Sequence, residues 1–285
     1  MLSALLLLLI VAGLAAQDVT KKAYSKRCPD GALGFAALSA LAALLFFTLT
    51  GLGSFAFSPA FLPYSAAFAA AYSLSVLFSL LAIREGPLSL SALFVSYSLL
   101  IPTVYGLIAW NESFDALLGI GLLLLLVSLL LIRKEGHGGE KRITPRWVLY
   151  ITVAFVGNGA CSTVQKAEQM RFDGLYKNEF MMVALAMSFV VLFACALAKE
   201  GRPLLTHARK GALLYLLCGT ANGAVNLFVL ILSLRMAASV MFPIISAGGI
   251  LTSSLLSVTV YKEKLSRTQW LGVLLGVFAI VVLNL

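Results

Sequence analysis

Charged residues are scarce in this chain of 285 residues: Asp, Glu, Lys and Arg make up 12%, against 61% hydrophobic residues. Soluble domains carry roughly 25% charged and 45 to 50% apolar residues, so this composition excludes a water-soluble globule. The apolar residues stand in solid runs such as LLLLLVSLLLI and not in alternation with polar ones. That pattern excludes a transmembrane β-barrel and favours membrane-spanning helices.

Cysteine and histidine are also rare, with 4 and 2 residues. Three cysteines lie in apolar runs and Cys28 stands alone, so we expect neither a disulfide framework nor a metal site. His137 and His207 fall between apolar runs without catalytic spacing, which argues against an enzyme, and we expect no cofactor. The net charge of +9 comes from basic residues between apolar runs. Lipid headgroups account for it, and we expect no nucleic-acid partner.

The apolar runs predict ten membrane-spanning helices, because about 20 apolar residues cross the hydrocarbon core. Expected spans are residues 2–19, 31–52, 59–83, 87–110, 116–132, 147–164, 180–198, 211–234, 236–261 and 268–285. The first run could instead be a signal peptide with a short apolar core at 5–14, but no basic residue precedes it. Before the last run, Ser266 and Gln269 form a capping-box pattern that predicts a helix start.

The second half of the chain resembles the first. A shift of 151 positions pairs Arg84 with Arg235, Glu112 with Glu263, Gly121 with Gly272 and Ser75 with Asn226; upstream, a shift of 145 pairs Val19 with Val164, Lys21 with Lys166 and Phe35 with Phe180. The sequence therefore predicts a first five-helix repeat in residues 1–132, a charged Gly-rich linker in 133–146 and a second five-helix repeat in 147–285.

Five is an odd number of crossings, so the second repeat must run through the membrane in the opposite direction. We expect an all-α membrane protein with ten transmembrane helices as two inverted five-helix repeats. Inverted repeats are typical of secondary transporters, whose substrate site lies near the midplane between the halves. The alternative is a duplicated helical bundle without transport.

Two segments, VYKEKLSRTQWLGVLLGVFAIVVL and more loosely AWNESFDALLGIGLLLLLVSLLL, resemble the closing helix pair of the EamA-type repeat in the drug/metabolite transporter superfamily. The resemblance implies a carrier with a small organic solute as substrate. We expect a multi-pass protein of the cell membrane, a monomer or homodimer among membrane lipids. The small multidrug exporters of that superfamily use a glutamate in their first helix. Here the first run holds only Asp18, so that mechanism is not expected.

Neutral polar side chains are the candidate substrate-binding groups, because the expected spans contain no Lys, Arg or Glu. Asn158, Ser162 and Gln165 share one helix face, as do Asn222 and Asn226. Tyr72 and Ser75 lie in a polar stripe of the third span, and Tyr97 lies with Ser96 and Tyr105 near Pro102 in the fourth.

The alternative role for these residues is hydrogen bonding between helices. We favour that role for the serines, and a cavity for the asparagines and Gln165. The small residues Gly249, Ser253 and Ser257 are assigned to packing.

Glu112 and Glu263 are candidate gates or ion-pair partners of a nearby lysine. The alternative, which we favour, is a carboxylate that stabilises the start of the next helix. Lys21, Lys22 and Lys166 could attract anionic substrates, but such residues more often reach lipid headgroups.

The loops on one side hold 17 Lys and Arg and those on the other hold 4. By the positive-inside rule this count puts both termini outside the cytoplasm, whereas the family resemblance implies cytoplasmic termini. The remaining alternatives are a lipid-linked-sugar flippase, a membrane-embedded enzyme and a structural subunit.

Overall fold

A computed structural model describes residues 2–53, 55–85, 91, 94–95, 97–133, 144–259 and 266–283. These residues contain eleven α-helices, one 3-10 helix and no strand. The helices are α1 (Leu2–Arg27), α2 (Ala32–Thr50), η1 (Pro59–Phe61), α3 (Leu62–Glu85), α5 (Leu100–Ala109), α6 (Ala116–Arg133), α7 (Pro145–Phe172), α8 (Lys177–Glu200), α9 (Pro203–Lys210), α10 (Ala212–Ser233), α11 (Ala238–Thr259) and α12 (Arg267–Leu283).

The helices are those of a multi-pass membrane protein. Among the described residues, seven are long and apolar enough to cross a membrane, and the shorter apolar helices α5, α6 and α12 lie in three further expected spans. In lipid every backbone group must be paired within the protein, which a helix does by itself. The capping box is confirmed: Ser266 N donates to Gln269 Oε1 at 2.9 Å, and Gln269 N donates to Ser266 Oγ at 3.2 Å.

Two expected ends were wrong. The first helix continues past Val19 to Arg27, and α7 continues past Val164 to Phe172. The prediction stopped where polar residues begin, but in α7 these polar residues are buried against neighbouring helices: Gln165, Lys166, Glu168 and Gln169 are each less than 5% exposed. α7 therefore contains Lys166 and Glu168, contrary to the expectation of spans without Lys, Arg or Glu. The short helix α9 was not expected at all.

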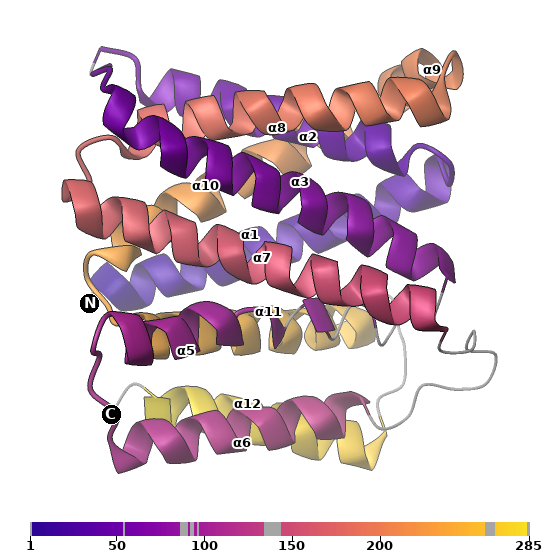
Figure 1. Cartoon of the computed structure of the whole chain (residues 1–285). Helices are drawn as coiled ribbons and strands as arrows, with labels where there is room; N and C mark the ends of the chain where they lie inside the picture. Colours follow the sequence, from indigo (N-terminus) through magenta and orange to yellow (C-terminus); the bar gives the residue numbers. More distant parts are fainter. Residues whose placement is uncertain are drawn as a thin grey trace.

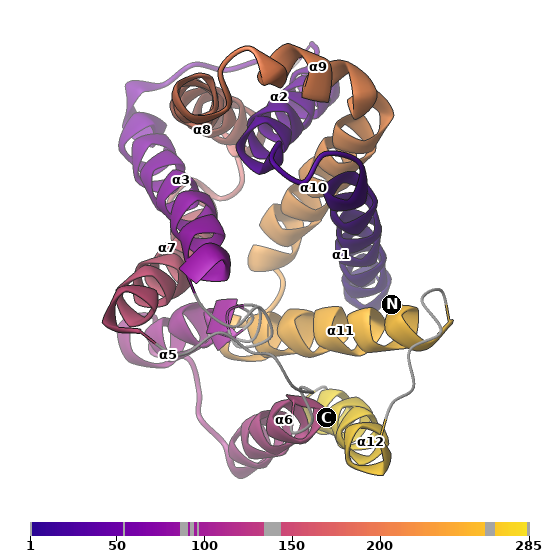
Figure 2. The ribbon, with the colours of Figure 1, turned by 90° about the vertical axis from the view of Figure 1, so that its right-hand side faces the viewer.

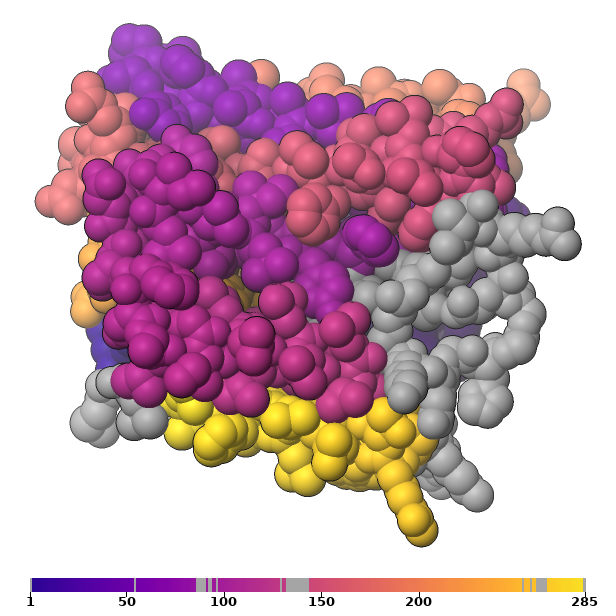
Figure 3. All heavy atoms as spheres, turned by 60° about the horizontal axis from the view of Figure 1, so that its bottom comes forward, coloured from indigo at the N-terminus to yellow at the C-terminus, as the bar shows by residue number. Residues whose placement is uncertain are grey.

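Helices from before and after the linker alternate in space. Figure 2, which looks along the helices, shows α2 with α8 at the top, α1 with α10 and α3 with α7 at the sides, and α5 with α11 above α6 and α12. Figure 3 shows the face on which α6 and α12 lie side by side below α5. The two halves are therefore interleaved and are not separate globular units.

Most helix contacts between the halves come in matched sets under the repeat correspondence α1 with α7, α2 with α8, α3 with α10, α5 with α11 and α6 with α12. The contact of α1 with α10 matches that of α7 with α3, α2 with α10 matches α8 with α3, and α1 with α11 matches α7 with α5. The pairs α2–α8, α5–α11 and α6–α12 each match themselves. Figure 1 shows both chain ends at the same end of the bundle.

Close helix approach depends on a glycine where α7 meets α3. A Cβ on Gly157 would lie 2.8 Å from Ala71 O and 3.0 Å from Ser75 N, so any side chain there would collide with the backbone of α3. Near the end of the bundle where the chain ends lie, the apolar core between these helices and α8 includes Phe61, Phe68 and Phe180, each no more than 2% exposed.

Candidate functional site

Four amide side chains from three helices form a continuous hydrogen-bonded row. Gln165 Nε2 of α7 donates to Asn226 Oδ1 of α10 at 2.7 Å, Asn226 Nδ2 donates to Asn222 Oδ1 at 3.0 Å, and Asn222 Nδ2 donates to Gln17 Oε1 of α1 at 3.2 Å. The expected pair Asn222 and Asn226 and the expected Gln165 are thus brought together. This amide row joins helices from both halves.

The amide row ends in a buried donor without a partner. Gln17 is 4% exposed, and its Nε2 has no hydrogen-bond partner among the described residues. A buried amide N–H left unpaired costs free energy comparable to a lost hydrogen bond, so such groups are rare in folded proteins. Asn222 and Asn226, by contrast, are half-buried in the middle of α10. Sequence reasoning missed Gln17, although it is the only amide in the first expected span.

Asn158 does not belong to the amide row. Its Nδ2 donates to Ser98 Oγ at 2.6 Å and to Val95 O at 3.5 Å, which ties α7 to the segment before α5. Ser162 lies half-buried on α7 between Asn158 and Gln165. The shared face was therefore correct, but its two ends bond to different helices, and Asn158 acts in helix packing.

Ser75 and Tyr72 of α3 also lie apart from the row. Ser75 is 6% exposed and its Oγ donates to Ala154 O of α7 at 3.2 Å. This bond is the hydrogen bonding between helices that we favoured for the serines. The half-buried Tyr72 stacks on Phe68 with ring centroids 5.8 Å apart. Ser75 thus serves the contact between α3 and α7.

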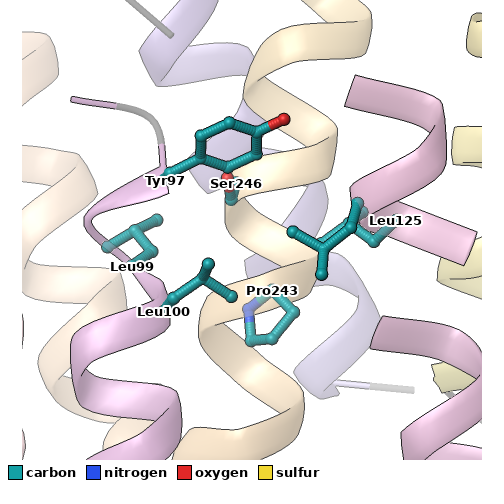
Figure 4. Close-up of a pocket in the computed structure, with 7 residues that line it drawn as sticks. Tyr97, Leu99, Leu100, Leu125, Pro243 and Ser246 are labelled. Carbon is teal, nitrogen blue, oxygen red and sulfur yellow. The ribbon is translucent and has the colours of Figure 1, made fainter. Parts of the chain in front are cut away.

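Tyr97 lines a small pocket between the segment before α5 and α11. Figure 4 shows its ring beside Ser246 of α11, with Leu99, Leu100 and Pro243 below and Leu125 to the right. The pocket encloses about 10 Å³, the space of roughly one water molecule, so it cannot hold an organic solute in this conformation. Ser96 lies outside the described residues.

Glu112 and Lys166 meet at the end of the bundle where the chain ends lie. Lys166 Nζ lies 3.3 Å from Glu112 Oε1, donates to Met236 O at 2.6 Å and stands 5.6 Å from the centroid of the Trp110 ring. Lys166 is 3% exposed, so the expectation that it reaches lipid headgroups was wrong. Its counterpart Lys21 is exposed.

The Glu112 carboxylate also caps a helix of the other half. Oε1 accepts from Ala238 N at 2.7 Å and Oε2 accepts from Ser239 N at 2.8 Å, at the start of α11. The favoured reading was a carboxylate at the start of the next helix, α6; that helix is instead capped by Asp115, which accepts from Leu118 N at 2.7 Å. Glu263, the counterpart of Glu112, lies outside the described residues.

The electrostatics of Glu112 favour its charged form. Partial burial acts to raise its pKa, but hydrogen bonds from the backbone of Ser239 and Ala238 and the charge of Lys166 outweigh burial, so the pKa is lowered from 4.5. Space for the carboxylate depends on Gly106, since a Cβ there would lie 2.6 Å from Glu112 Oε2.

Two further glutamates bind distant backbone amides, and sequence reasoning missed both. Glu200 Oε1 accepts from Leu33 N at 2.8 Å and Gly34 N at 2.9 Å, which caps α2. Glu179 is 3% exposed, and its Oε1 accepts from Ala56 N at 2.8 Å. Carboxylates at helix starts pair the free amides and complement the helix dipole. No group of three metal-ligating side chains occurs in the described part of the chain.

Comparisons with known proteins agree with a membrane carrier fold. The model of the EamA-like transporter family matches residues 145–285. No curated protein matches the chain. A solved structure described as "Crystal structure of protein" is similar over 98% of this chain and 95% of its own, with a TM-score of 0.81 and 15% identity. At that identity the likeness concerns the fold alone.

Proposed function

Residues 145–285 belong to the EamA-like transporter family, and from that premise we propose that the protein is a secondary transporter of small organic solutes. It works by alternating access between two inverted five-helix repeats, residues 1–132 and 147–285, in the cell membrane. The matched helix contacts support this organisation, because an inverted duplication predicts that each contact between halves has a counterpart. In such carriers the two halves rock about a site at their interface.

The observation that carries the proposal is the amide row. It lies between helices of both repeats, and it presents the half-buried Asn222 and Asn226 together with the free Nε2 of Gln17. Polar groups inside a membrane protein mark substrate pathways when they face an interior path. An unpaired N–H donor fits an oxygen acceptor, so the solute carries a carbonyl, carboxylate or hydroxyl oxygen that binds Gln17.

Glu112 and Lys166 form the gate of this carrier. Their ion pair joins the loop after α5 to α7, and the same carboxylate binds the first amides of α11, so one side chain ties three elements at one end of the bundle. Opening that end requires these contacts to separate. The amide row starts at Gln165, next to Lys166, and leads away from this end along α10 to Asn222 and Gln17, where a solute can bind while the gate is closed.

An apolar groove supports a second candidate, a lipid-linked-sugar flippase. The groove has a volume of about 480 Å³ and is lined by side chains of α5 and by Phe155 of α7. A lipid tail could lie in it while a sugar headgroup passes between the repeats. Transfer of a fluorescent lipid-linked sugar between leaflets of vesicles separates this candidate from solute transport.

The test is solute binding and uptake by the purified protein. A thermal-shift screen over amino acids, nucleosides, sugars and organic acids should find solutes that raise Tm, because ligand binding to the folded state stabilises it. Vesicles containing the protein should then take up those solutes. The double variant Asn222→Ala, Asn226→Ala and the single variant Gln17→Met should lose uptake.

Asn158→Ala is the matched control, since it removes another half-buried asparagine of the bundle whose bonds lie elsewhere. It should keep uptake. Normal uptake by a folded Asn222→Ala, Asn226→Ala variant would contradict the assigned site, and absence of uptake of any solute by the unaltered protein would contradict the proposed function.

A further inference from the structure

The last turns of α7 hold a buried carboxyl and a buried amide that the amide row does not use. Glu168 and Gln169 are both 0% exposed, and Gln169 Nε2 donates to Glu168 Oε2. The other oxygens, Glu168 Oε1 and Gln169 Oε1, have no hydrogen-bond partner among the described residues. Two unpaired acceptors on neighbouring residues lack a donor, and protonation of the Glu168 carboxyl supplies one as its O–H group.

The charge that acts on Glu168 is negative, and the cations that follow it on α7 and α8, Arg171 and Lys177, form no hydrogen bond with its Oε1. Glu179 of α8 acts on it electrostatically, and its own Oε1 is held by Ala56 N. Lys166 lies two positions earlier on α7 and therefore on another face, where it is engaged with Glu112 and Met236.

The helices packed against α7 add no cation at this end. The α5 and α10 segments contain no charged residue, and α3 carries only Arg84 and Glu85, at its far end. Near the end of α7 that holds Glu168, α3 contributes Tyr64, whose ring packs on Phe172.

This arrangement can serve both protonation states of one carboxyl. An amide both donates and accepts, so the Gln169 NH₂ can donate to a Glu168 carboxylate, and after rotation its oxygen can accept from a Glu168 carboxylic acid. A charged carboxylate buried without a cation is costly, and binding a proton to Oε1 removes the charge.

Glu168 is also placed to affect the amide row. Gln165 precedes Glu168 and Gln169 by three and four positions, so all three lie on one side of α7. Gln165 in turn donates to Asn226. A change in the bonding of Glu168 therefore occurs one helical turn from the end of the row.

We propose that Glu168 is the proton-binding carboxyl that couples solute movement to a proton gradient, with Gln169 as its hydrogen-bond partner in both states. The proton binds to Glu168 Oε1 and leaves from the same atom, on the other side of the membrane, and no other bond changes. The coupling role rests on the proposed transport function, whereas proton binding at Glu168 does not.

The first test uses the proton alone. Infrared difference spectra of the protein in vesicles, recorded between acid and neutral pH, should show the carbonyl stretch of a protonated buried carboxyl, and Glu168→Gln should abolish this band. Glu179→Gln is the matched control, because Glu179 has a backbone donor; it should keep the band. Persistence of the band in Glu168→Gln would overturn the proposal. If that variant does not fold, Glu168→Asp must shift the band, and an unshifted band would overturn it equally.

The second test separates coupling from transport. Vesicles with an inward or outward pH gradient are given a mixture of amino acids, nucleosides and sugars, and accumulation is measured by mass spectrometry. Glu168→Gln should reduce accumulation to the level seen without a gradient while solute exchange continues. Undiminished accumulation, or loss of exchange as well, would overturn the coupling role. If the unaltered protein moves no solute, the proposed function and the coupling role fail, but the infrared band still decides proton binding.

Discussion

Glu112 and Lys166 form an ion pair with an N–O distance of 3.3 Å, buried where three elements from both halves of the chain meet. Removing one member of a buried pair leaves the other charge without compensation, at a typical cost of about 3 to 5 kcal/mol. Lys166→Met should therefore lower Tm strongly in detergent. Lys21→Met, at the exposed counterpart position, should leave Tm almost unchanged.

The pair can be isolated by a double-mutant cycle. Lys166→Met combined with Glu112→Gln should destabilise less than the sum of the two single variants, because neither charge is then left alone. Additive losses of stability would mean that the two side chains act independently.

Stability should depend on pH through Glu112. Its folded-state pKa is lowered from 4.5, so its contribution to stability is complete above the unfolded-state value and is lost as the pH falls through the folded-state value. Tm should fall on acidification below about pH 4.5, and part of that fall should be absent in Glu112→Gln. Parallel Tm curves for the two proteins would contradict the assignment.

Glu200 should hold the start of α2. Glu200→Ala removes the acceptor of Leu33 N and Gly34 N and should cost about 0.5 to 2 kcal/mol, the range for helix caps. Hydrogen exchange in the first turn of α2 should accelerate. Glu85→Ala, at an exposed glutamate in the last turn of α3, is the control and should change neither quantity.

Gly157 and Gly249 should respond oppositely to alanine. Alanine is favoured over glycine in a helix by about 1 kcal/mol, but at position 157 its Cβ would meet the α3 backbone at 2.8 Å. Gly157→Ala should lower Tm. At position 249 the nearest atom is the end of the Leu14 side chain at 3.3 Å, so Gly249→Ala should be neutral or stabilising. Equal Tm values for Gly157→Ala and Gly249→Ala would mean that α3 and α7 lie farther apart than in this structure.

Orientation should follow the distribution of basic residues. Cys28 is 3% exposed and unsuited to labelling, whereas Ser25 in the last turn of α1 and Ser113 in the loop between α5 and α6 are exposed. The last turn of α1 and that loop lie at opposite ends of the bundle (Figure 1). The positive-inside rule puts the Lys-rich end of α1 in the cytoplasm. In intact cells an impermeant thiol reagent should modify Ser113→Cys and spare Ser25→Cys; the reverse pattern would invert the topology.

Hydropathy alone located the apolar helices, because a helix is the simplest way to pair a backbone in lipid. It misjudged the end of α7 for an equally physical reason. The apolar run stops at Gln165, yet tertiary contacts pair Gln165 and Lys166 inside the protein. Hydropathy detects contact with lipid, whereas these side chains contact other helices.

Helical spacing likewise predicted part of the candidate site. It put Asn222 near Asn226 and chose Gln165, but it could not tell which partner each amide would meet. Asn158 therefore bonds to Ser98 instead. The contacts of Glu112 and Glu200 join residues more than a hundred positions apart, and only the folded chain specifies them.

Three amides of the row, Gln165, Asn226 and Asn222, donate in the same direction, towards Gln17. Neither Asn226 nor Asn222 can turn over alone, because a reversed amide would set oxygen against oxygen on one side and hydrogen against hydrogen on the other. The hydrogen bonds of the row can therefore reverse their direction only if its amides turn together, so the row has two alternative directions. A solute oxygen that binds Gln17 would therefore fix the hydrogen-bond direction of the row as far away as α7.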